Sequence, residues 1–264
     1  MGNIFDEQKL YPYEGAIKEH FEDHYNTVFI AFLPFFQLDR EETDKSNLKK
    51  AKLLSHEEAL KEIDLIKKLP EANREIYSYD NDRYPADEEI FSKGKGTPWK
   101  NIVNGSCLAG YAELNTALRT SIGGLNRNFT RPDLMEKLNN FTDHESIYHP
   151  TEGAFGILSK MAIRKALKLL GKNQILITDE FYENTTTIDL DRLTEYEFCD
   201  EIGGKDYYLY SADKEILFTI EWDSFFFLIA TDRKKMDQLI ASHLFEGFLC
   251  NDKTDHYWEY TVDI

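Results

Sequence analysis

The clearest pattern of apolar and polar positions lies in the second half of the chain, where short apolar runs follow one another closely. These runs are rich in β-branched and aromatic residues and are separated by the turn sequences Gly203-Gly204, Asp213-Lys214 and Asp223-Ser224. We predict strands at 174–178, 195–202, 207–211, 216–222 and 225–231. Because the spacing leaves no room for crossover helices, the strands are expected to pair antiparallel as a meander.

Helical periodicity marks the segments on both sides of this predicted sheet. Apolar residues recur at helical spacing over 151–170, and Gly171 follows as a stop signal. Lys160, Arg164 and Lys168 repeat every four residues in this helix, which predicts a solvated charged face. A second helix over 232–244 is expected to cover one face of the sheet.

The first half of the chain reads as mainly helical. Patterning predicts helices at 13–25, 55–69, 106–122 and 131–141, a buried strand at 27–36, and a long irregular connection over 76–100. The fold class is therefore α+β, with a helix-rich N-terminal half and an antiparallel β-meander with a covering helix in the C-terminal half. We expect a single globular domain over 1–264, with a possible subdivision near residue 150.

Charge is distributed unevenly along the chain. The formal net charge is -17, yet the middle segment, residues 92–178, carries 12 basic and only 6 acidic residues. Residues 1–91 carry 12 basic and 21 acidic residues, and residues 179–264 carry 7 basic and 21 acidic residues. A basic middle between acidic ends is either neutralised by its own flanks on folding or available to an anion. The acidic balance opposes binding to nucleic acid or to anionic lipid surfaces.

The N-terminal residues and the apolar runs bear on the compartment. The first thirty residues lack a basic start followed by an apolar stretch, and no apolar run approaches the roughly 20 residues needed to cross a bilayer. We therefore expect a cytoplasmic protein. No motif predicts a cofactor or a metal site.

One candidate for catalysis is Cys107. Asn104-Gly105-Ser106 resembles a turn followed by an N-cap, which predicts that Cys107 lies in a first helical turn, where free amides and the helix dipole stabilise a thiolate. Cysteine hydrolases also need a histidine that a third polar group orients. His256, with Asp255 or Asp263 beside it, is one candidate partner. The alternative is that Cys107 is a small buried apolar residue.

The glycine-rich stretch 92–100 suggests a weaker hypothesis of anion binding. It does not have the residue spacing of a Walker phosphate loop. Cations in and after this stretch are candidates for an anion-binding surface, and the alternative is that they pair with the acidic flanks. They are Lys93, Lys95, Lys100, Arg119, Arg127 and Arg131.

The end of the chain resembles a known family. The stretch Phe245-Glu246-Gly247-Phe248-Leu249-Cys250, continuing to Thr254 and Trp258, is similar to the end of an uncharacterised domain-of-unknown-function family from Gram-positive bacteria. The segment 215–244 before it fits the same resemblance. The resemblance implies a soluble bacterial protein without an assigned activity.

Three hypotheses of function follow. The first is a soluble, acidic interaction or accessory protein without catalytic activity, whose surface meets a basic protein partner and neither membrane nor nucleic acid. The second is a cysteine-dependent hydrolase or transferase that uses Cys107. The third is a small-anion or nucleotide binder that uses the basic middle segment.

Overall fold

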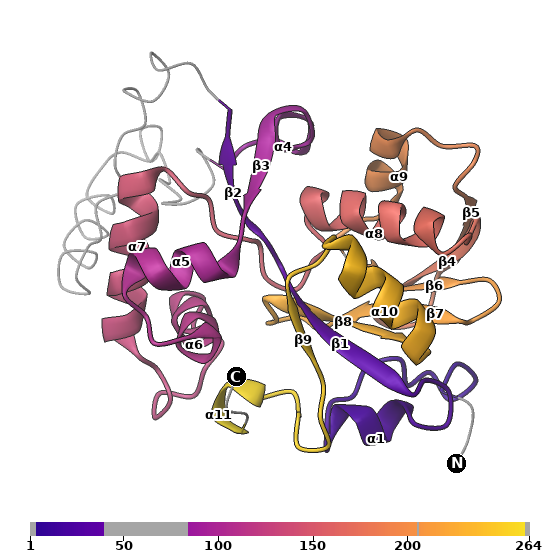
Figure 1. Ribbon diagram of the computed structural model, residues 1–264, viewed down its shortest axis with the longest axis horizontal. Coiled ribbons are helices and arrows are strands. Elements are labelled where there is room, and N and C mark those ends of the chain that lie inside the picture. The colour runs from indigo at the N-terminus through magenta and orange to yellow at the C-terminus, as the bar shows by residue number, and fades with distance from the viewer. Residues whose placement is uncertain (1–3, 40–83, 205, 262–264) are drawn as a thin grey trace, which may run out of the picture.

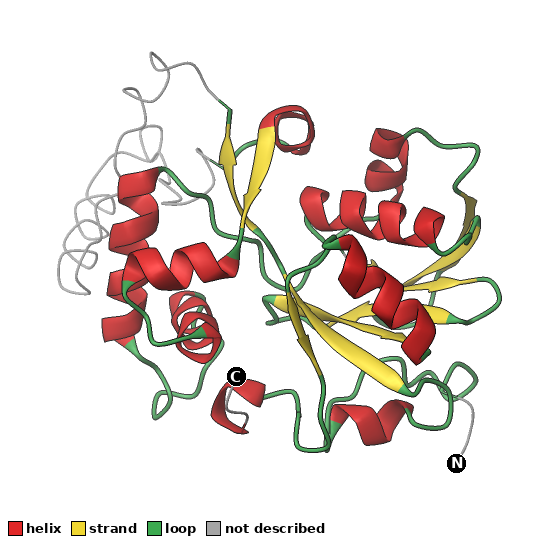
Figure 2. Cartoon of the chain, viewed as in Figure 1, coloured by secondary structure: helices red, strands yellow, loops and turns green. Residues whose placement is uncertain are grey.

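A strand from the N-terminal half of the chain, β1 (Thr27–Phe32), lies inside the sheet that the second half builds. The computed structural model describes residues 4–39, 84–204 and 206–261. Within them the fold is α+β, as predicted. Figures 1 and 2 show the helices α5, α6 and α7 together on the left, and the sheet on the right with α8 and α10 in front of it.

The described residues form a sheet of seven strands in the order β5-β4-β6-β7-β8-β1-β9, and every neighbouring pair is antiparallel. Four of its strands confirm predicted ones: β4 (Gln174–Asp179), β6 (Asp206–Ser211), β7 (Ile216–Ile220) and β8 (Phe226–Thr231). Two edge strands, β5 (Thr185–Asp189) and β9 (Gly247–Leu249), were not predicted. All six residues of β1 and all six of β8 are buried, which explains their continuous apolar sequences.

The predicted strand at 195–202 is wrong, because this segment forms helix α9 (Glu195–Glu201). The Thr194 side chain accepts a hydrogen bond from the Glu197 N–H, and the Glu197 carboxylate accepts one from the Thr194 N–H, which makes a capping box. Helix α9 connects β5 to β6, and these strands lie on opposite sides of β4. The prediction that no helix crosses between strands is therefore also wrong.

Helix α10 (Arg233–Ser242) confirms the predicted covering helix. The Asp232 side chain caps its N-terminus, and Met236 and Leu239 are buried on the side that packs against β1. Figure 1 shows α10 lying across the front of the sheet.

Helix α8 (Ile157–Leu169) ends as predicted, with Gly171 in a left-handed conformation, but it begins later than residue 151. Gly153 has φ +62°, and a Cβ there would lie 1.9 Å from the Trp222 carbonyl oxygen. This close approach requires glycine and holds the segment before α8 in a loop.

The predicted solvated face of α8 is also wrong. Lys160 is buried and donates to the carbonyl oxygens of Cys199 (3.0 Å) and Ile202 (2.6 Å). Arg164 donates to the Leu193 carbonyl oxygen at 2.8 Å. These two cations connect α8 to the segment around α9. They supply the hydrogen-bond donors that the carbonyl groups of that segment need when they are buried.

The N-terminal half supplies most of the remaining helices. These are α1 (Ile17–Phe21), α4 (Asp87–Lys93), α5 (Trp99–Ser106), α6 (Tyr111–Ser121) and α7 (Pro132–Glu145), and the C-terminal segment adds α11 (Trp258–Thr261). The predicted helix at 131–141 is confirmed by α7, and the one at 106–122 by α6, which begins later than predicted. The predicted strand at 27–36 is divided, since Leu33 and Pro34 separate β1 from β2 (Phe35–Leu38), which pairs with β3 (Gly94–Thr97).

Two further predictions for this half have different outcomes. The stretch 84–100 is not irregular, because it contains α4, β3 and the start of α5. The helix predicted at 55–69 lies outside the described residues.

Trp99, the first residue of α5, packs against the sheet and so connects α5 to it. Its ring stacks on Phe32 of β1 with centroids 4.2 Å apart, and its Nε1–H donates to the Leu33 carbonyl oxygen at 2.7 Å. The Glu246 carboxylate accepts from the backbone N–H groups of Trp99 (2.6 Å) and Lys100 (2.9 Å), and so caps α5.

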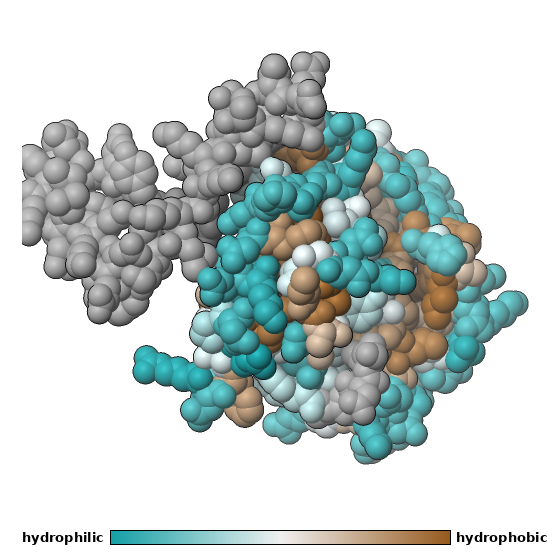
Figure 3. All heavy atoms as spheres, turned by 60° about the vertical axis from the view of Figure 1, so that its left-hand side comes forward, coloured by the Kyte–Doolittle hydropathy of each residue, from teal (hydrophilic) through white to brown (hydrophobic). Residues whose placement is uncertain are grey.

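On the face that Figure 3 turns forward, apolar patches lie between polar side chains.

Candidate functional site

Cys107 does not lie at the start of a helix, so the prediction of its position is wrong. Helix α5 runs to Ser106, and Cys107 is its C-cap in a left-handed conformation with φ 56°. Gly105 lies within α5, and it must be glycine because a Cβ there would lie 2.0 Å from the ring of Phe141 on α7. Cys107 therefore lies at the opposite end of α5 from the free N–H groups on which the prediction depends.

The described residues around Cys107 include no catalytic partner that contacts it. Its side chain is exposed. None of the hydrogen bonds or ring contacts found among the described residues joins it to a histidine. The other two cysteines, Cys199 and Cys250, are buried, and burial raises their pKa values to about 11 and about 12.

The six cations predicted to bind an anion are distributed over several elements. Lys93 and Lys95 line a hollow of about 220 Å³ that also contains Asp39, and Lys95 pairs with Asp39 at 2.8 Å. Lys93 lies 4.0 Å from Glu89, and Arg131 pairs with Asp133 at 2.7 Å.

The remaining three members of that set do not join them. Lys100 on α5 and Arg127 in the loop after α6 are exposed, whereas Arg119 is buried within α6. The structure therefore brings Lys93 and Lys95 together and leaves the other four elsewhere.

Most cations of the middle segment contact the protein's own acceptors. Seven of its 12 basic residues form ion pairs with other described residues, and two more, Lys160 and Arg164, donate to backbone carbonyl oxygens. Six of the seven paired cations have their partner in an acidic flank. Those that pair with the C-terminal flank are Arg119, Lys165, Lys168 and Lys172.

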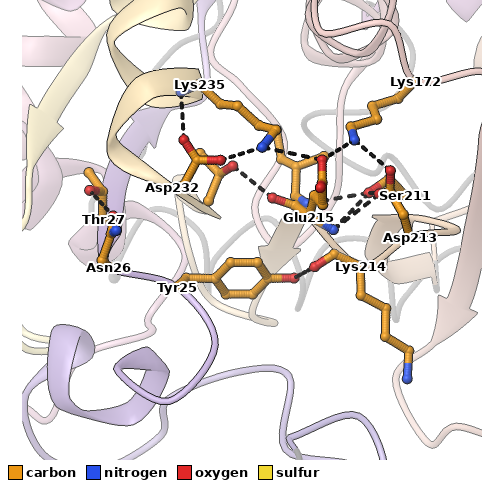
Figure 4. Close-up of polar contacts among 12 residues, drawn as sticks. Tyr25, Asn26, Thr27, Lys172, Ser211, Asp213, Lys214, Glu215, Asp232 and Lys235 are labelled. Carbon is orange, nitrogen blue, oxygen red and sulfur yellow. Dashed lines mark hydrogen bonds and ion pairs between the residues drawn. The ribbon is translucent and has the colours of Figure 1, made fainter.

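Lys172 shows how this pairing links distant segments (Figure 4). Its ammonium group lies 2.5 Å from Asp213 and also contacts Glu215, both in the turn between β6 and β7. Glu215 in turn lies 3.2 Å from Lys235 of α10. The cluster joins the end of α8, the β6–β7 turn and the covering helix at one end of the sheet.

At the opposite end of the sheet, a buried polar cluster joins four parts of the chain. Arg119 of α6 pairs with Glu259 of α11, with Nη1 2.8 Å from Oε1, and both side chains are almost fully buried. The Arg119 guanidinium also lies 5.1 Å from the centre of the Tyr257 ring, and its Nη2 donates to the Gly124 carbonyl oxygen. A buried guanidinium of this kind requires both a counter-charge and acceptors.

His256 lies beside this ion pair. Its Nδ1 is hydrogen-bonded to the Tyr11 hydroxyl at 2.8 Å, and its Nε2 lies 3.6 Å from Oε2 of Glu221, at the end of β7. The Ser224 hydroxyl and the Asp223 N–H both donate to the same Glu221 oxygen at 3.3 Å. His256 was predicted as a catalytic partner of Cys107, and Arg119 as part of an anion-binding surface. The structure instead brings these two residues into one buried cluster.

Burial controls the ionisation of this cluster. Burial, assisted by the Arg119 charge, lowers the pKa of His256 to about 4, so the imidazole is neutral at pH 7. Burial also raises the pKa of Glu221, and it raises the pKa of Tyr11 well above its usual value. Burial raises the pKa of Glu259 as well, although the Arg119 charge opposes this change.

The contacts of this cluster are internal and connect segments of the chain to one another. Both ring nitrogens of His256 face protein oxygens, so the fold itself fixes the ring orientation. Two hollows among the described residues lie elsewhere, beside Lys93 and, with about 60 Å³, between β2, α4 and the start of α8. Sequence reasoning missed Tyr11 and Glu259 and gave Glu221 no role, because these residues meet His256 or Arg119 only through the fold.

Comparison with known proteins places the chain in a family. The family model described as a protein of unknown function, DUF2711, matches residues 65–260. The chain belongs to the DUF2711 family. This finding confirms the resemblance to an uncharacterised bacterial family, and it extends that resemblance far beyond the last fifth of the chain.

A curated relative is similarly uncharacterised. The chain is 28% identical over 179 residues to the uncharacterized protein YwbB of Bacillus subtilis (strain 168). The aligned residues cover 66% of this chain and 77% of YwbB. No solved structure matches the chain.

Two further findings concern groups of metal ligands and membrane-spanning helices in the part of the chain that the structure describes. Within it, no three His, Cys, Asp or Glu side chains are grouped so that they could hold a metal ion. No helix among the same residues has the length and apolar character that crossing a membrane requires.

Proposed function

We propose that this DUF2711 protein is a non-catalytic interaction protein whose acidic surface binds a basic protein partner. The observation that carries the proposal is the pairing of the middle cations with the protein's own acidic flanks. Because these cations pair with carboxylates of the same chain, they do not form a separate basic surface, and the net charge of -17 stays an excess of carboxylates that a cationic partner can neutralise. A surface of this kind attracts cationic partners over distances of about the Debye length, roughly 10 Å at 0.1 M salt.

The two alternative hypotheses receive less support. A cysteine hydrolase needs an activated thiol, and Cys107 is the C-cap of α5, away from the free N–H groups at the start of a helix. An anion binder needs convergent cations, and the proposed set is distributed over several elements, with Arg119 buried against Glu259. A cytoplasmic location is part of the proposal.

The experiment is a titration with two synthetic peptides of equal length. One alternates arginine with serine, and the other alternates glutamate with serine. At low ionic strength we expect isothermal titration calorimetry to detect binding of the arginine peptide and no binding of the glutamate peptide. If the arginine peptide does not bind, or if both bind equally, the proposal is wrong.

A further inference from the structure

The turns at one end of the sheet carry aromatic and acidic side chains side by side. Strands β4, β6 and β7 are neighbours, and Thr178, Tyr208 and Thr219 form one row across them. Neighbouring strands lie about 4.8 Å apart, so the turns that follow Thr178 and Thr219 lie about 10 Å apart. These are the β4–β5 turn, which contains Glu180 and Phe181, and the β7–β8 turn, which contains Trp222 and Asp223.

Three large aromatic side chains at this end of the sheet are exposed. Phe181 is 70% exposed, Trp222 60% and Tyr13 57%. The backbone beneath Trp222 is held firmly, because the Gly153 N–H donates to the Ser224 carbonyl oxygen at 2.9 Å and Gly153 fits against the Trp222 carbonyl. Tyr13 packs on the buried Tyr11, with ring centroids 5.1 Å apart. Exposed rings on a fixed backbone are typical of binding surfaces.

Carboxylates surround these rings. Besides burial, the negative charges of Glu221 and Glu180 raise the pKa of Tyr13, and those of Glu180, Glu221 and Asp223 raise the pKa of Tyr207. No lysine or arginine among the described residues forms an ion pair with Glu180 or Asp223. The local potential is therefore negative beside exposed aromatic faces.

We propose that this surface, the acidic aromatic edge formed by Tyr13, Glu180, Phe181, Trp222 and Asp223, binds an arginine-rich segment of a partner protein. The proposal rests on the function proposed above and names the place and the chemistry of binding. A guanidinium group stacks on the face of Trp222 or Phe181 while a neighbouring carboxylate neutralises it. Charge complementarity selects this occupant, because an acidic segment or a second copy of this acidic chain is repelled.

Trp222 supplies a direct readout of binding. It is the exposed member of the three tryptophans, since Trp99 and Trp258 are fully buried. Quenching of tryptophan fluorescence by acrylamide therefore reports mainly on Trp222. We expect saturating arginine-serine peptide to reduce this quenching at least twofold, whereas unchanged quenching overturns the proposal.

Variants test the same surface by affinity. Trp222→Ala combined with Glu180→Gln and Asp223→Asn is expected to weaken binding of the arginine-serine peptide about tenfold or more. The control variant combines Ile240→Ala with Glu22→Gln and Asp23→Asn, which removes the same charge and one exposed apolar side chain at other places. It is expected to bind within about twofold of the wild type. Urea unfolding of both variants verifies that they are folded.

The outcomes separate this proposal from the one on which it rests. If the wild type does not bind the peptide, the proposed function fails. If the wild type and the edge variant bind equally well, only the acidic aromatic edge is excluded. If sedimentation shows a wild-type dimer that Trp222→Ala dissociates, the edge belongs to a second copy of the chain, and the proposal is again overturned.

Discussion

Arg119 and Glu259 form a buried ion pair across 140 residues of sequence, with Nη1 2.8 Å from Oε1. The pair joins α6 to α11. Replacing one member leaves the other as an uncompensated buried charge, which costs about 3–5 kcal/mol. We predict a loss of this size for Arg119→Met in the free energy of unfolding by urea.

The double variant Arg119→Met with Glu259→Leu serves as the control for this prediction. It removes both charges and is expected to recover most of the stability. A loss below about 1 kcal/mol for Arg119→Met alone would show that the pair is solvated, contrary to the structure.

Glu246 caps helix α5 from a distant part of the chain. Its two carboxylate oxygens accept from the N–H groups of Trp99 and Lys100. Glu246→Ala leaves these donors without their acceptor and is expected to lower stability by about 1–3 kcal/mol, measured by urea unfolding. The matched control is Glu113→Ala, which removes the acceptor of the Ala109 N–H at an exposed site and is expected to cost less. Equal losses for the two variants would contradict the capping role of Glu246.

Cys107 has the left-handed conformation that glycine adopts without strain at a helix end. Because its side chain is exposed, Cys107→Gly is expected to raise stability by about 0.5–1 kcal/mol, whereas Cys107→Ala is expected to leave stability nearly unchanged. Thermal unfolding measures both. A destabilising Cys107→Gly substitution would mean that the thiol makes contacts that the structure lacks.

His149 is expected to make the protein sensitive to acid. Burial lowers its pKa to about 4, from the usual 6.5, and its Nε2 is hydrogen-bonded to Thr142 at 2.8 Å. Between these pH values the unfolded chain binds more protons than the folded one. The contribution of His149 to the free energy of unfolding is therefore largest above about pH 6.5. It decreases as the pH falls from about 6.5 to about 4, and it changes little below pH 4.

The variant His149→Gln isolates this contribution. It is expected to reduce the stability difference between pH 7 and pH 4 by roughly 2–3 kcal/mol, as measured by urea unfolding at each pH. His256 adds a similar term, while the raised pKa values of Glu221 and Glu259 act in the opposite direction. An unchanged pH dependence in His149→Gln would contradict the lowered pKa.

The sequence predicted β4, β6, β7 and β8, where apolar runs and turns are local signals, and it missed the edge strand β5, which begins with three exposed threonines. It failed at 195–202, where Tyr196 and Phe198 suggested a strand and the capping box of Thr194 and Glu197 was the better signal. It failed at Cys107 because Gly105 suggested a turn. Gly105 is instead part of helix α5, and its missing side chain leaves room for Phe141 on another helix.

The candidate site was harder to predict than the fold. His256 and Arg119 were identified singly, but their partners Tyr11 and Glu259 lie in distant parts of the chain and carry no local pattern. The pairing of the basic middle with its flanks was one of two alternatives that sequence left open, and ion pairs such as that of Lys172 support it. That the chain forms a single domain stays a prediction.

The ionic-strength dependence of arginine-serine peptide binding tests the central claim most directly. If the acidic surface binds basic partners, the association constant measured by calorimetry falls steeply as sodium chloride rises from about 0.02 M to about 0.5 M, because screening shortens the Debye length. Binding that is absent at the lowest salt concentration, or an affinity that does not change over this range, would contradict the account.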